Sequence, residues 1–301
     1  MVKLNGNSAL AGNCNLINTG YRVTICTARI LYGDTMIFVI DIGNSHTVTG
    51  IYRDKQLIAE WRLRSNAKST ADELAITYTT LFDISAIENN TISGVIISSV
   101  VPTLEAAWVA CCNKHLSRHC THPPFVVKVE KISNLISVAL DNPTDVGADR
   151  LVNAIAAWRI HNNKQIIIDF GTAITFDCVT ETCEYLGGAI IPGIAISLDA
   201  LANKTAKLPH IDVSEAPPGI IGKSTVHAMK SGILYGYGAM IDGVVKGIKK
   251  EMIQSPSEKF TVMATGGMAQ LIAPFTTTIE TIDPLLTLKG LEYIYRQVAN
   301  K

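Results

Sequence analysis

Hydrophobic residues fall along this chain in short continuous runs that alternate with segments of helical periodicity. Continuous apolar runs of about four to eight residues are typical of buried strands, whereas apolar positions three or four apart are typical of amphipathic helices. The runs predict strands at residues 37–40, 47–52, 57–64, 94–101, 125–129, 165–168, 173–180, 184–191 and 260–264. The helical spacing predicts helices at residues 70–83, 103–116, 151–161, 194–202, 224–250 and 287–298. This alternation indicates an α/β fold with mainly parallel sheets and some antiparallel hairpins.

The same pattern occurs twice. One buried strand ends in Asp41-Ile42-Gly43-Asn44, and another ends in Asp169-Phe170-Gly171-Thr172. Each is followed by two β-rich runs that a polar turn separates. An internal repeat of a whole supersecondary unit indicates a duplicated fold. We therefore predict one domain over residues 36–160 and a second over residues 161–301.

Residues 1–35 differ from both halves, because they are rich in Asn and Gly and contain one short apolar stretch. Met36 directly precedes the first clean strand. Chain termini without packing partners are commonly disordered, so we interpret residues 1–35 as a poorly ordered extension that precedes the working start. An additional strand within residues 23–31 is the alternative.

Composition narrows the class of protein. The 301 residues include 26 Lys and Arg against 26 Asp and Glu, and aromatic residues make up 6%. This balance lacks the basic surface typical of nucleic-acid binding proteins. No apolar run approaches the roughly 20 residues that a membrane span needs, and asparagines interrupt any signal-peptide core near the start. The seven cysteines are scattered and odd in number, which indicates reduced thiols in the cytoplasm.

The two Asp-x-Gly turns carry the first candidate chemistry. A strand that ends in Asp41 or Asp169 places a carboxylate at the carboxyl edge of a sheet, and the following glycine lets backbone N–H groups face an anion. Asn44, Ser45 and Thr172 add hydrogen-bond donors for phosphate oxygens. Either turn alone is explained by ordinary turn chemistry, since Asp and Gly end many strands. Because both open the same kind of unit, we predict that they bind phosphate groups and a cation.

A loop that leads into a predicted helix carries a second candidate. Pro143 and Gly147 fix this loop, and Asp149 lies in the first helical turn beside Arg150. The helix N-terminus and the guanidinium should keep Asp149 ionised, so that it could accept the proton of an attacking alcohol. Arg150 could hold a carboxylate in a two-pronged contact. From the spacing alone, an acidic residue favoured by the helix dipole beside a surface Arg is the simpler interpretation.

The stretch Gly222-Lys223-Ser224-Thr225 resembles the end of a phosphate-binding P-loop. It fails the full pattern, because Pro217 stands where the first glycine is required and no strand precedes it. Thr225 at the start of a helix is nevertheless suited to cap that helix or to contact a ligand.

Cys111, His115 and His119 share one face of a predicted helix and raise the question of a metal site. They lack the paired Cys-x-x-Cys typical of structural zinc sites. A buried cysteine and surface histidines are the simpler interpretation.

Taken together, the motifs along the chain resemble those of type III pantothenate kinase, the bacterial enzyme of the first step in coenzyme A synthesis. The resemblance covers about residues 36–298. Its motifs are Asp41-Ile42-Gly43-Asn44, Ile97-Ser98-Ser99-Val100-Val101-Pro102, Asn142-Pro143, Val146-Gly147-Ala148-Asp149-Arg150, Ile168-Asp169-Phe170-Gly171-Thr172-Ala173-x-Thr175-Phe176-Asp177, Gly187-Gly188-Ala189-Ile190-x-Pro192-Gly193, Gly222-Lys223-Ser224-Thr225 and Thr265-Gly266-Gly267. No single motif is specific, but their number and their order are.

The resemblance implies a fold of the acetate-kinase, sugar-kinase, Hsp70 and actin superfamily. Two duplicated actin-like, ribonuclease H-like domains would carry mixed, mostly parallel sheets with a cleft between them, usually in a homodimer. The implied activity is the ATP-dependent phosphorylation of the primary hydroxyl of pantothenate to 4'-phosphopantothenate. No nucleic-acid or membrane partner is implied.

The resemblance also implies roles for individual residues. The implied ATP site consists of Asp41, Ile42, Gly43, Asn44, Ser45, His46, Thr47, Val48, Thr172, Gly266 and Gly267. The implied pantothenate site consists of Gly147, Ala148, Asp149, Arg150 and Thr225. Asp149 would accept the proton of the hydroxyl, and Asp169 would bind a potassium or ammonium ion, with magnesium accompanying ATP.

The chain departs from the family pattern at two positions. Leu140 stands where relatives often carry Tyr, so one hydrogen bond to pantothenate, with a net value of about 0.5–1.5 kcal/mol, is in doubt. Ser45 replaces the commoner Thr and keeps the hydroxyl.

Two other functions suit the same scaffold. A regulatory or transcription accessory protein should have lost the acidic site residues, whereas Asp41, Asp149 and Asp169 are all present. A superfamily relative that acts on sugars or polyphosphate would keep the phosphate loops and differ in its acceptor.

Overall fold

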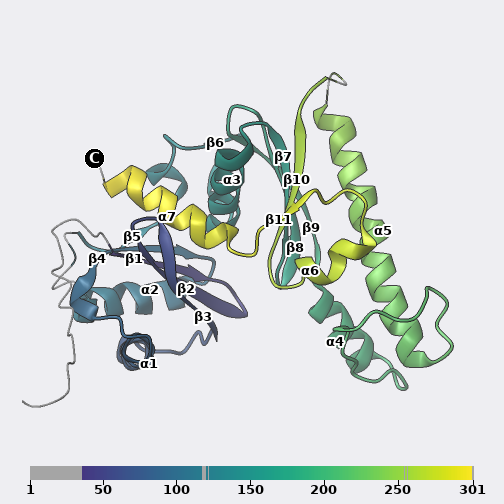
Figure 1. The fold of residues 1–301 in the computed structure, drawn as a ribbon, viewed down its shortest axis with the longest axis horizontal. Coiled ribbons are helices and arrows are strands. Elements are labelled where there is room, and N and C mark those ends of the chain that lie inside the picture. Colours follow the sequence, from purple (N-terminus) through teal and green to yellow (C-terminus); the bar gives the residue numbers. More distant parts are fainter. Residues whose placement is uncertain (1–35, 117–119, 121, 254, 256, 300–301) are drawn as a thin grey trace, which may run out of the picture. The chain divides into compact units, whose positions relative to one another are not determined.

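The computed structural model describes residues 36–299, apart from 117–119, 121, 254 and 256 (Figure 1). The predicted extension at 1–35 and the alternative strand at 23–31 therefore lie outside the described residues. Within the described part, no helix is both long and apolar enough to cross a membrane.

A five-stranded sheet forms from the first half of the chain, in the order β3-β2-β1-β4-β5. Its strands are β1 (Met36–Ile42), β2 (His46–Arg53), β3 (Gln56–Arg64), β4 (Ile92–Ser99) and β5 (Phe125–Val126). The first three pair antiparallel, whereas β4 lies parallel to β1 and to β5. One face packs on α1 (Ala71–Ile84) and α2 (Pro102–Cys111), where Phe38 contacts the rings of Phe82 and Trp108.

A six-stranded sheet forms from the second half, in the order β11-β10-β7-β8-β9-β6. Its strands are β6 (Ser137–Val138), β7 (Lys164–Phe170), β8 (Ala173–Val179), β9 (Glu184–Pro192), β10 (Phe260–Thr265) and β11 (Thr281–Ile282). One face packs on α4 (Ile194–Lys204), α5 (Thr225–Met252) and α6 (Ala269–Ile272). The antiparallel hairpins β7-β8-β9 repeat the arrangement of β1-β2-β3, so the predicted duplication is confirmed.

Two helices lie between the sheets (Figure 1). Helix α3 (Ala148–His161) and helix α7 (Leu286–Ala299) contact each other and share one hydrophobic core with residues of both sheets, among them Ile37 and Ile167. Because α7 comes from the end of the chain and contacts β1 and β4, the chain returns to its first sheet. The domain boundary near residue 160 stays a prediction.

Local sequence signals explain where several elements begin and end. Helix α1 starts with a capping box, in which the Thr70 hydroxyl accepts a bond from the Glu73 N–H and the Glu73 carboxylate accepts one from the Thr70 N–H. Helix α3 ends at Asn162, which adopts a left-handed conformation with φ of 49°.

Two predicted elements end earlier than the sequence predicts. The helix predicted at 103–116 ends at Cys111 and continues as a single π-helical turn at Cys112–Leu116. The strand predicted at 125–129 stops after Val126, because a 3₁₀ turn begins at Val129. Helix α3 begins at Ala148 with Gly147 as its N-cap, which agrees with the prediction that Asp149 lies in the first helical turn. The two-residue strands β6 and β11 were not predicted, because so short a segment shows no period.

Candidate active site

The first Asp-x-Gly turn closes tightly between β1 and β2. The Gly43 N–H donates to the His46 carbonyl at 3.0 Å, and the Ser65 hydroxyl donates to the Gly43 carbonyl at 2.6 Å. A Cβ atom at Gly43 would lie 3.0 Å from the His46 carbonyl oxygen, so a side chain would crowd the turn. Asp41 lies on β1 opposite Val48 on one side and Ser98 on the other.

The predicted ATP segment 41–48 contains both buried and exposed side chains. Asn44 and Ser45 are exposed at the tip of the turn, and His46 is half-buried. Ile42 and Thr47 are buried, the latter with its hydroxyl bonded to Ser65 at 2.9 Å. These two can therefore face a nucleotide through their backbone only.

The second Asp-x-Gly turn repeats this geometry between β7 and β8. Asp169 pairs with Thr175 of β8 and with Thr265 of β10, as Asp41 pairs with Val48 and Ser98. The Gly171 N–H donates to the Ala173 carbonyl at 3.1 Å. The Thr172 carbonyl accepts a bond from the Gly193 N–H at 3.1 Å, so the start of α4 supports this turn.

The tips of the two turns meet. The Ser45 and Thr172 hydroxyl oxygens lie 2.7 Å apart, although 127 positions separate the residues in the chain. Both side chains are exposed. The structure therefore brings together the hydroxyl donors that the repeat predicted.

The predicted glycine pair, Gly266 and Gly267, lies beside the second Asp-x-Gly turn and Arg62. Gly266 has a φ of +89°, and a Cβ atom there would lie 2.5 Å from the Asp169 carboxylate and 2.7 Å from the Phe170 nitrogen. Only glycine suits this position without strain. A Cβ atom at Gly267 would lie 3.6 Å from two guanidinium nitrogens of Arg62. The turn after β10 thus lies beside Asp169 and Arg62.

Asp149 lies in the first turn of α3, as predicted, and its carboxylate accepts the Arg150 N–H at 2.8 Å. A Cβ atom at Gly147 would lie 2.5 Å from this carboxylate. Burial raises the pKa of Asp149, and the bond from the Arg150 backbone and the charge of Arg150 only oppose that rise. Burial thus outweighs both opposing effects on the pKa, and the ionised state of Asp149 stays a prediction.

The other two predicted carboxylates share this environment. Burial, followed by the charges of Asp149 and Asp169, raises the pKa of Asp41 to about 8, although a Ser98 hydrogen bond and the Arg62 charge act in the opposite direction. Burial, followed by the charges of Asp149 and Asp177, raises the pKa of Asp169 to about 7. The negative charge of Asp149 thus acts on both carboxylates, and such a cluster of acidic groups favours the binding of positive charge.

The carboxylates do not form a closed metal cage. Among the described residues, no group of three or more His, Cys, Asp or Glu side chains converges enough to hold a metal ion. Magnesium commonly keeps several waters and binds one or two carboxylates together with substrate phosphates. The acidic oxygens present fit a cation that arrives with a nucleotide better than a resident metal.

Arg150 is already paired within the protein. Its Nε donates to the fully buried Asp177 carboxylate at 2.6 Å, and the Tyr185 hydroxyl donates to the same oxygen at 2.7 Å. The Thr175 hydroxyl donates to the other Asp177 oxygen at 3.0 Å. Sequence reasoning missed Asp177 and Tyr185 as partners, although Thr175 and Asp177 alternate on the face of β8 that meets α3.

Two further neighbours were also missed. The Asn153 amide donates to Asp169 at 3.2 Å, and the Thr287 hydroxyl donates to the Asn153 amide oxygen at 2.8 Å. A buried Asn on an Ala-rich helix was a usable signal, since buried polar groups need partners. Sequence reasoning also missed Arg62.

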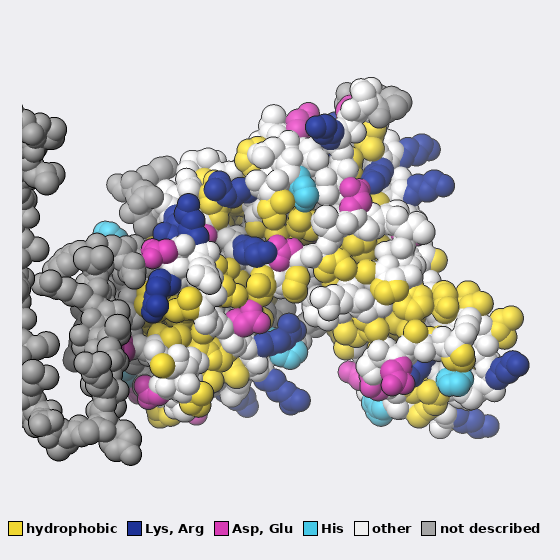
Figure 2. All heavy atoms as spheres, viewed as in Figure 1, with side chains coloured by type: hydrophobic (Ala, Val, Ile, Leu, Met, Phe, Trp, Pro, Cys, Tyr) yellow, Lys and Arg dark blue, Asp and Glu magenta, His cyan; other side chains and the backbone are white. Residues whose placement is uncertain are grey.

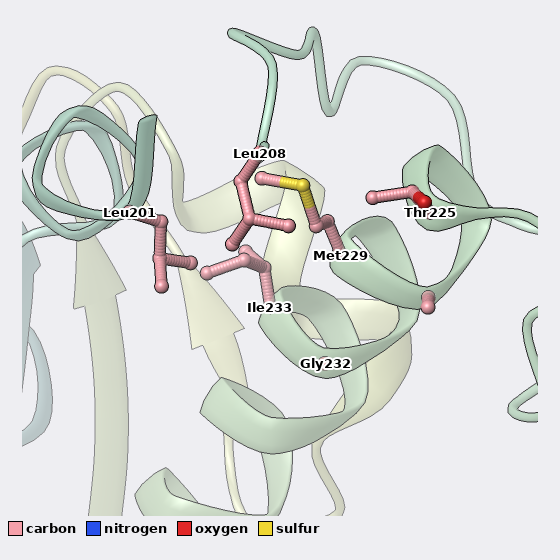
Figure 3. Close-up of a pocket in the computed structure, with 7 residues that line it drawn as sticks. Leu201, Leu208, Thr225, Met229, Gly232 and Ile233 are labelled. Atoms are coloured by element: carbon pink, nitrogen blue, oxygen red, sulfur yellow. The ribbon is translucent and has the colours of Figure 1, made fainter. Parts of the chain in front are cut away.

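Two further predicted positions, Leu140 and Thr225, have other neighbours. Leu140 is half-buried and lies 3.1 Å from the position of a Cβ atom at Gly187. Thr225 lines a hollow of about 520 Å³ between α4 and α5, together with apolar side chains such as Leu201 and Met229 (Figure 3). No other predicted site residue lines that hollow.

The candidate metal residues have other contacts. Cys111 is buried, and His115 lies 2.9 Å from the Asp72 carboxylate. His119 lies outside the described residues.

Comparison with known proteins identifies the family. The model of the type III pantothenate kinase family matches residues 37–247. The chain belongs to this family. A type III pantothenate kinase of Desulfotalea psychrophila is 56% identical over 266 residues, which cover 88% of this chain and 100% of that protein. One of Desulforapulum autotrophicum is 44% identical over 262 residues, which cover 87% and 97%.

Solved structures of distant sequence share the fold. A Campylobacter jejuni protein assigned to the Baf family of transcriptional activators has a TM-score of 0.52 at 17% identity, over 88% of this chain and 100% of that one. A Listeria monocytogenes protein assigned as an N-acetylmannosamine kinase has a TM-score of 0.52 at 12% identity, over 88% and 100%. At such identities the likeness concerns the fold alone, and it confirms the actin-like class predicted for this pantothenate kinase family member.

Proposed function

We propose that this protein is a cytoplasmic homodimer that transfers the terminal phosphate of ATP to the primary hydroxyl of pantothenate, which yields 4'-phosphopantothenate for coenzyme A synthesis. The family membership at 56% identity over 266 residues carries this proposal. The meeting of the two Asp-x-Gly turns, with Ser45 and Thr172 2.7 Å apart, supports the phosphate-binding part of it.

In this proposal the backbone of residues 41–48, the Thr172 hydroxyl and the turn at Gly266 and Gly267 bind ATP. The exposed hydroxyls and amides at both turn tips can donate to phosphate oxygens. The glycines at 266 and 267 keep side chains away from the place where the nucleotide would approach.

Asp149 is the proposed proton acceptor. Asp149 lies in the first turn of α3, and its charge raises the pKa of both Asp41 and Asp169. We infer from this that it lies near both Asp-x-Gly turns. A carboxylate with a raised pKa is a stronger base than an ordinary aspartate, provided that it is ionised when the hydroxyl attacks. Positive charge at the site favours that ionised form.

Cations complete the proposal. Asp169 would bind a potassium or ammonium ion, and Asp41 lies where magnesium bound to ATP could contact it. When bound, these ions would neutralise phosphate charge. Asn153 holds one Asp169 oxygen and so fixes the orientation of the other.

The pantothenate site would comprise Gly147, Ala148, Asp149, Arg150 and Thr225. Asp177 engages Nε of Arg150, and the remaining guanidinium donors can bind the pantothenate carboxylate. The half-buried Leu140 can supply an apolar contact where relatives often have Tyr, so we assign it no polar role.

Helix α5 is the proposed surface for the homodimer. Gly238 packs against the Phe275 carbonyl, but Cβ atoms at Gly232, Gly236 and Gly243 would meet nothing within 4 Å. The surface at Gly232 and Gly236 is thus open within this chain. Hydrophobic side chains gather around α4 and α5 on the face drawn in Figure 2.

Exposed hydrophobic side chains of α4 and of the loop before α5 include Ile196, Ile220 and Ile221. A second copy packed on α5 would bury this surface together with the glycines. Because Thr225 begins the same helix and lines a separate hollow, we propose that each copy offers Thr225 to the pantothenate site of the other.

The test is a coupled assay of ADP release with pantothenate, glucose, N-acetyl sugars and polyphosphate offered separately. We expect turnover with pantothenate only, and only when magnesium and potassium or ammonium are present. Turnover with a sugar or polyphosphate would favour the superfamily alternative. ATP binding without any turnover would favour a regulatory protein on the same scaffold.

A further inference from the structure

Arg62 of β3 lies in the same row of the first sheet as Asp41. Arg62 pairs with Val48, and Val48 pairs with Asp41. Residues directly opposite each other on neighbouring strands project from the same face of a sheet. The guanidinium of Arg62 therefore stands on the face where the Asp41 carboxylate stands.

The guanidinium lies beside both turns that the nucleotide is proposed to contact. Its Nη2 is 3.4 Å from Nδ1 of His46, at the end of the first Asp-x-Gly turn. Its Nη1 and Nη2 are each 3.6 Å from the place of a Cβ atom at Gly267, in the turn after β10. Burial, followed by the charges of Arg62 and Arg64, lowers the pKa of His46, so its neutral ring can accept a hydrogen bond from Arg62.

The charge of Arg62 reaches the carboxylates of both sheets. This charge acts to lower the pKa of Asp41 and the pKa of Asp169, although burial acts more strongly and raises both. Arg150, the other arginine of the site, is paired with the buried Asp177. Among the described residues Arg62 has no carboxylate partner within ion-pair distance, and its side chain is exposed. Its donors are thus available to a ligand.

We propose that Arg62 binds the terminal phosphate of ATP and stabilises the charge on the phosphoryl group during transfer. A planar guanidinium matches phosphate oxygens in a two-pronged geometry that an ammonium cannot reproduce. The glycine at 267 leaves the space next to Nη1 and Nη2 open for those oxygens. This role rests on the proposed function, because it concerns the same transfer.

The step balances as an ordinary displacement. The pantothenate hydroxyl oxygen forms a bond to the terminal phosphorus, and the bond from that phosphorus to the bridging oxygen breaks. The hydroxyl proton goes to the Asp149 carboxylate, and the bridging oxygen leaves as part of ADP. Arg62 gives and receives no proton, and it acts by hydrogen bonds and charge.

Arg62→Gln, Arg62→Lys and the control Arg64→Gln test the proposal. Arg64 is a matched control, because it is exposed on the same strand, on the same face and two positions away. Calorimetry measures ATP and ADP binding without pantothenate, and steady-state assays measure kcat and KM. Thermal unfolding of each variant checks that it folds.

For Arg62→Gln we expect kcat to fall by about 10²–10³-fold, the usual loss when one donor to a developing charge is removed. ATP binding should weaken by roughly tenfold, the lower end for a hydrogen bond to a charged group, while ADP binding stays the same. Arg62→Lys should recover part of kcat, since charge returns without the planar geometry. Arg64→Gln should match the wild type.

Equal effects of Arg62→Gln and Arg64→Gln would overturn the proposal, and so would an equal loss of ATP and ADP binding in Arg62→Gln. If the wild type binds ATP but does not phosphorylate pantothenate, the proposed function fails, and the comparison of ATP with ADP binding still decides the role of Arg62. If the wild type does not bind ATP, both fail.

Discussion

The two sheets place an aspartate at the same point of the same strand, yet they surround it differently. Asp41 has Ser98 and Val48 as neighbours across the strands, and beyond Val48 the exposed Arg62. Asp169 has Thr175 and Thr265 as its neighbours, and it accepts a bond from Asn153 of α3. Both are half-buried, and both have a raised pKa.

The duplicated motif therefore stands in two different environments. The first carboxylate has an exposed cation in its own sheet, which suits the charged end of a nucleotide. The second has a neutral amide as its neighbour. The amide orients the carboxylate oxygens by a hydrogen bond and does not neutralise their negative charge. Asp149 lies close enough to influence both, and it belongs to neither turn.

The largest expected effect is on kcat, and it distinguishes the role of Asp149 from that of the two Asp-x-Gly turns. Asp149→Asn should lower kcat by about 10²–10⁴-fold, the typical contribution of a positioned general base, while ATP binding stays near the wild-type level. Rapid-quench assays and calorimetry measure the two quantities. Asp145→Asn is the control, because this exposed carboxylate lies four positions earlier and contacts Asn142. Substantial turnover in Asp149→Asn would move the base elsewhere.

The next effect separates the two turns from each other. Asp169→Asn should raise the potassium concentration for half-maximal activity by about tenfold or more, since a charged ligand contact is lost. Asp41→Asn should instead raise the magnesium-ATP requirement and leave the potassium dependence unchanged. Titration of both ions against activity measures this. Identical shifts in the two variants would show that the turns are equivalent after all.

A smaller effect concerns the free energy of unfolding. Gly266→Ala should lower it by about 1–3 kcal/mol, because the residue has a φ of +89° and the new Cβ would meet the Asp169 carboxylate. Gly43→Ala should cost less, because Gly43 lacks a positive φ and its Cβ would only approach the His46 carbonyl at 3.0 Å. Urea unfolding compares them. A larger loss at Gly43 would contradict this ranking.

A further effect is a pH dependence of the stability of the ligand-free protein. An unfolded Asp has a pKa near 3.8, whereas the folded value is about 8 for Asp41 and about 7 for Asp169. Between these values the folded state binds more protons, so stability should fall as pH rises from about 4 to 8. Asp41→Asn should flatten this fall up to about pH 8, and Asp169→Asn up to about pH 7. Unfolding free energies measured from pH 5 to 8.5 check it, and an unchanged slope would contradict the shifts.

Most of the fold was predictable because strands and helices follow local periods. The hairpins after Asp41 and Asp169, the cap at Thr70 and the long helix near 225–252 were all visible in the sequence. The π-helical turn after Cys111 and the two-residue strands were not, since packing and neighbouring strands decide them.

Less of the site was predictable. The turns and Asp149 were found because they carry recognisable motifs. Asp177, Asn153 and Arg62 were missed, because each acts on a residue that the fold alone brings near: Asp177 bonds Arg150 from 27 positions away. Conversely, Thr225 looked like a neighbour of Asp149 and instead lines a separate hollow.

The sequence by itself determined that two strands end in Asp-x-Gly and that the chain belongs to one kinase family. Backbone periodicity and turn chemistry are local, so they can be read from neighbouring residues. Only the tertiary structure decided which carboxylate has which neighbour, how far each pKa rises and that Arg62 faces both turns. The reason is that burial and electrostatic interaction depend on distances through space, and these distances cannot be read from the separation of residues along the chain.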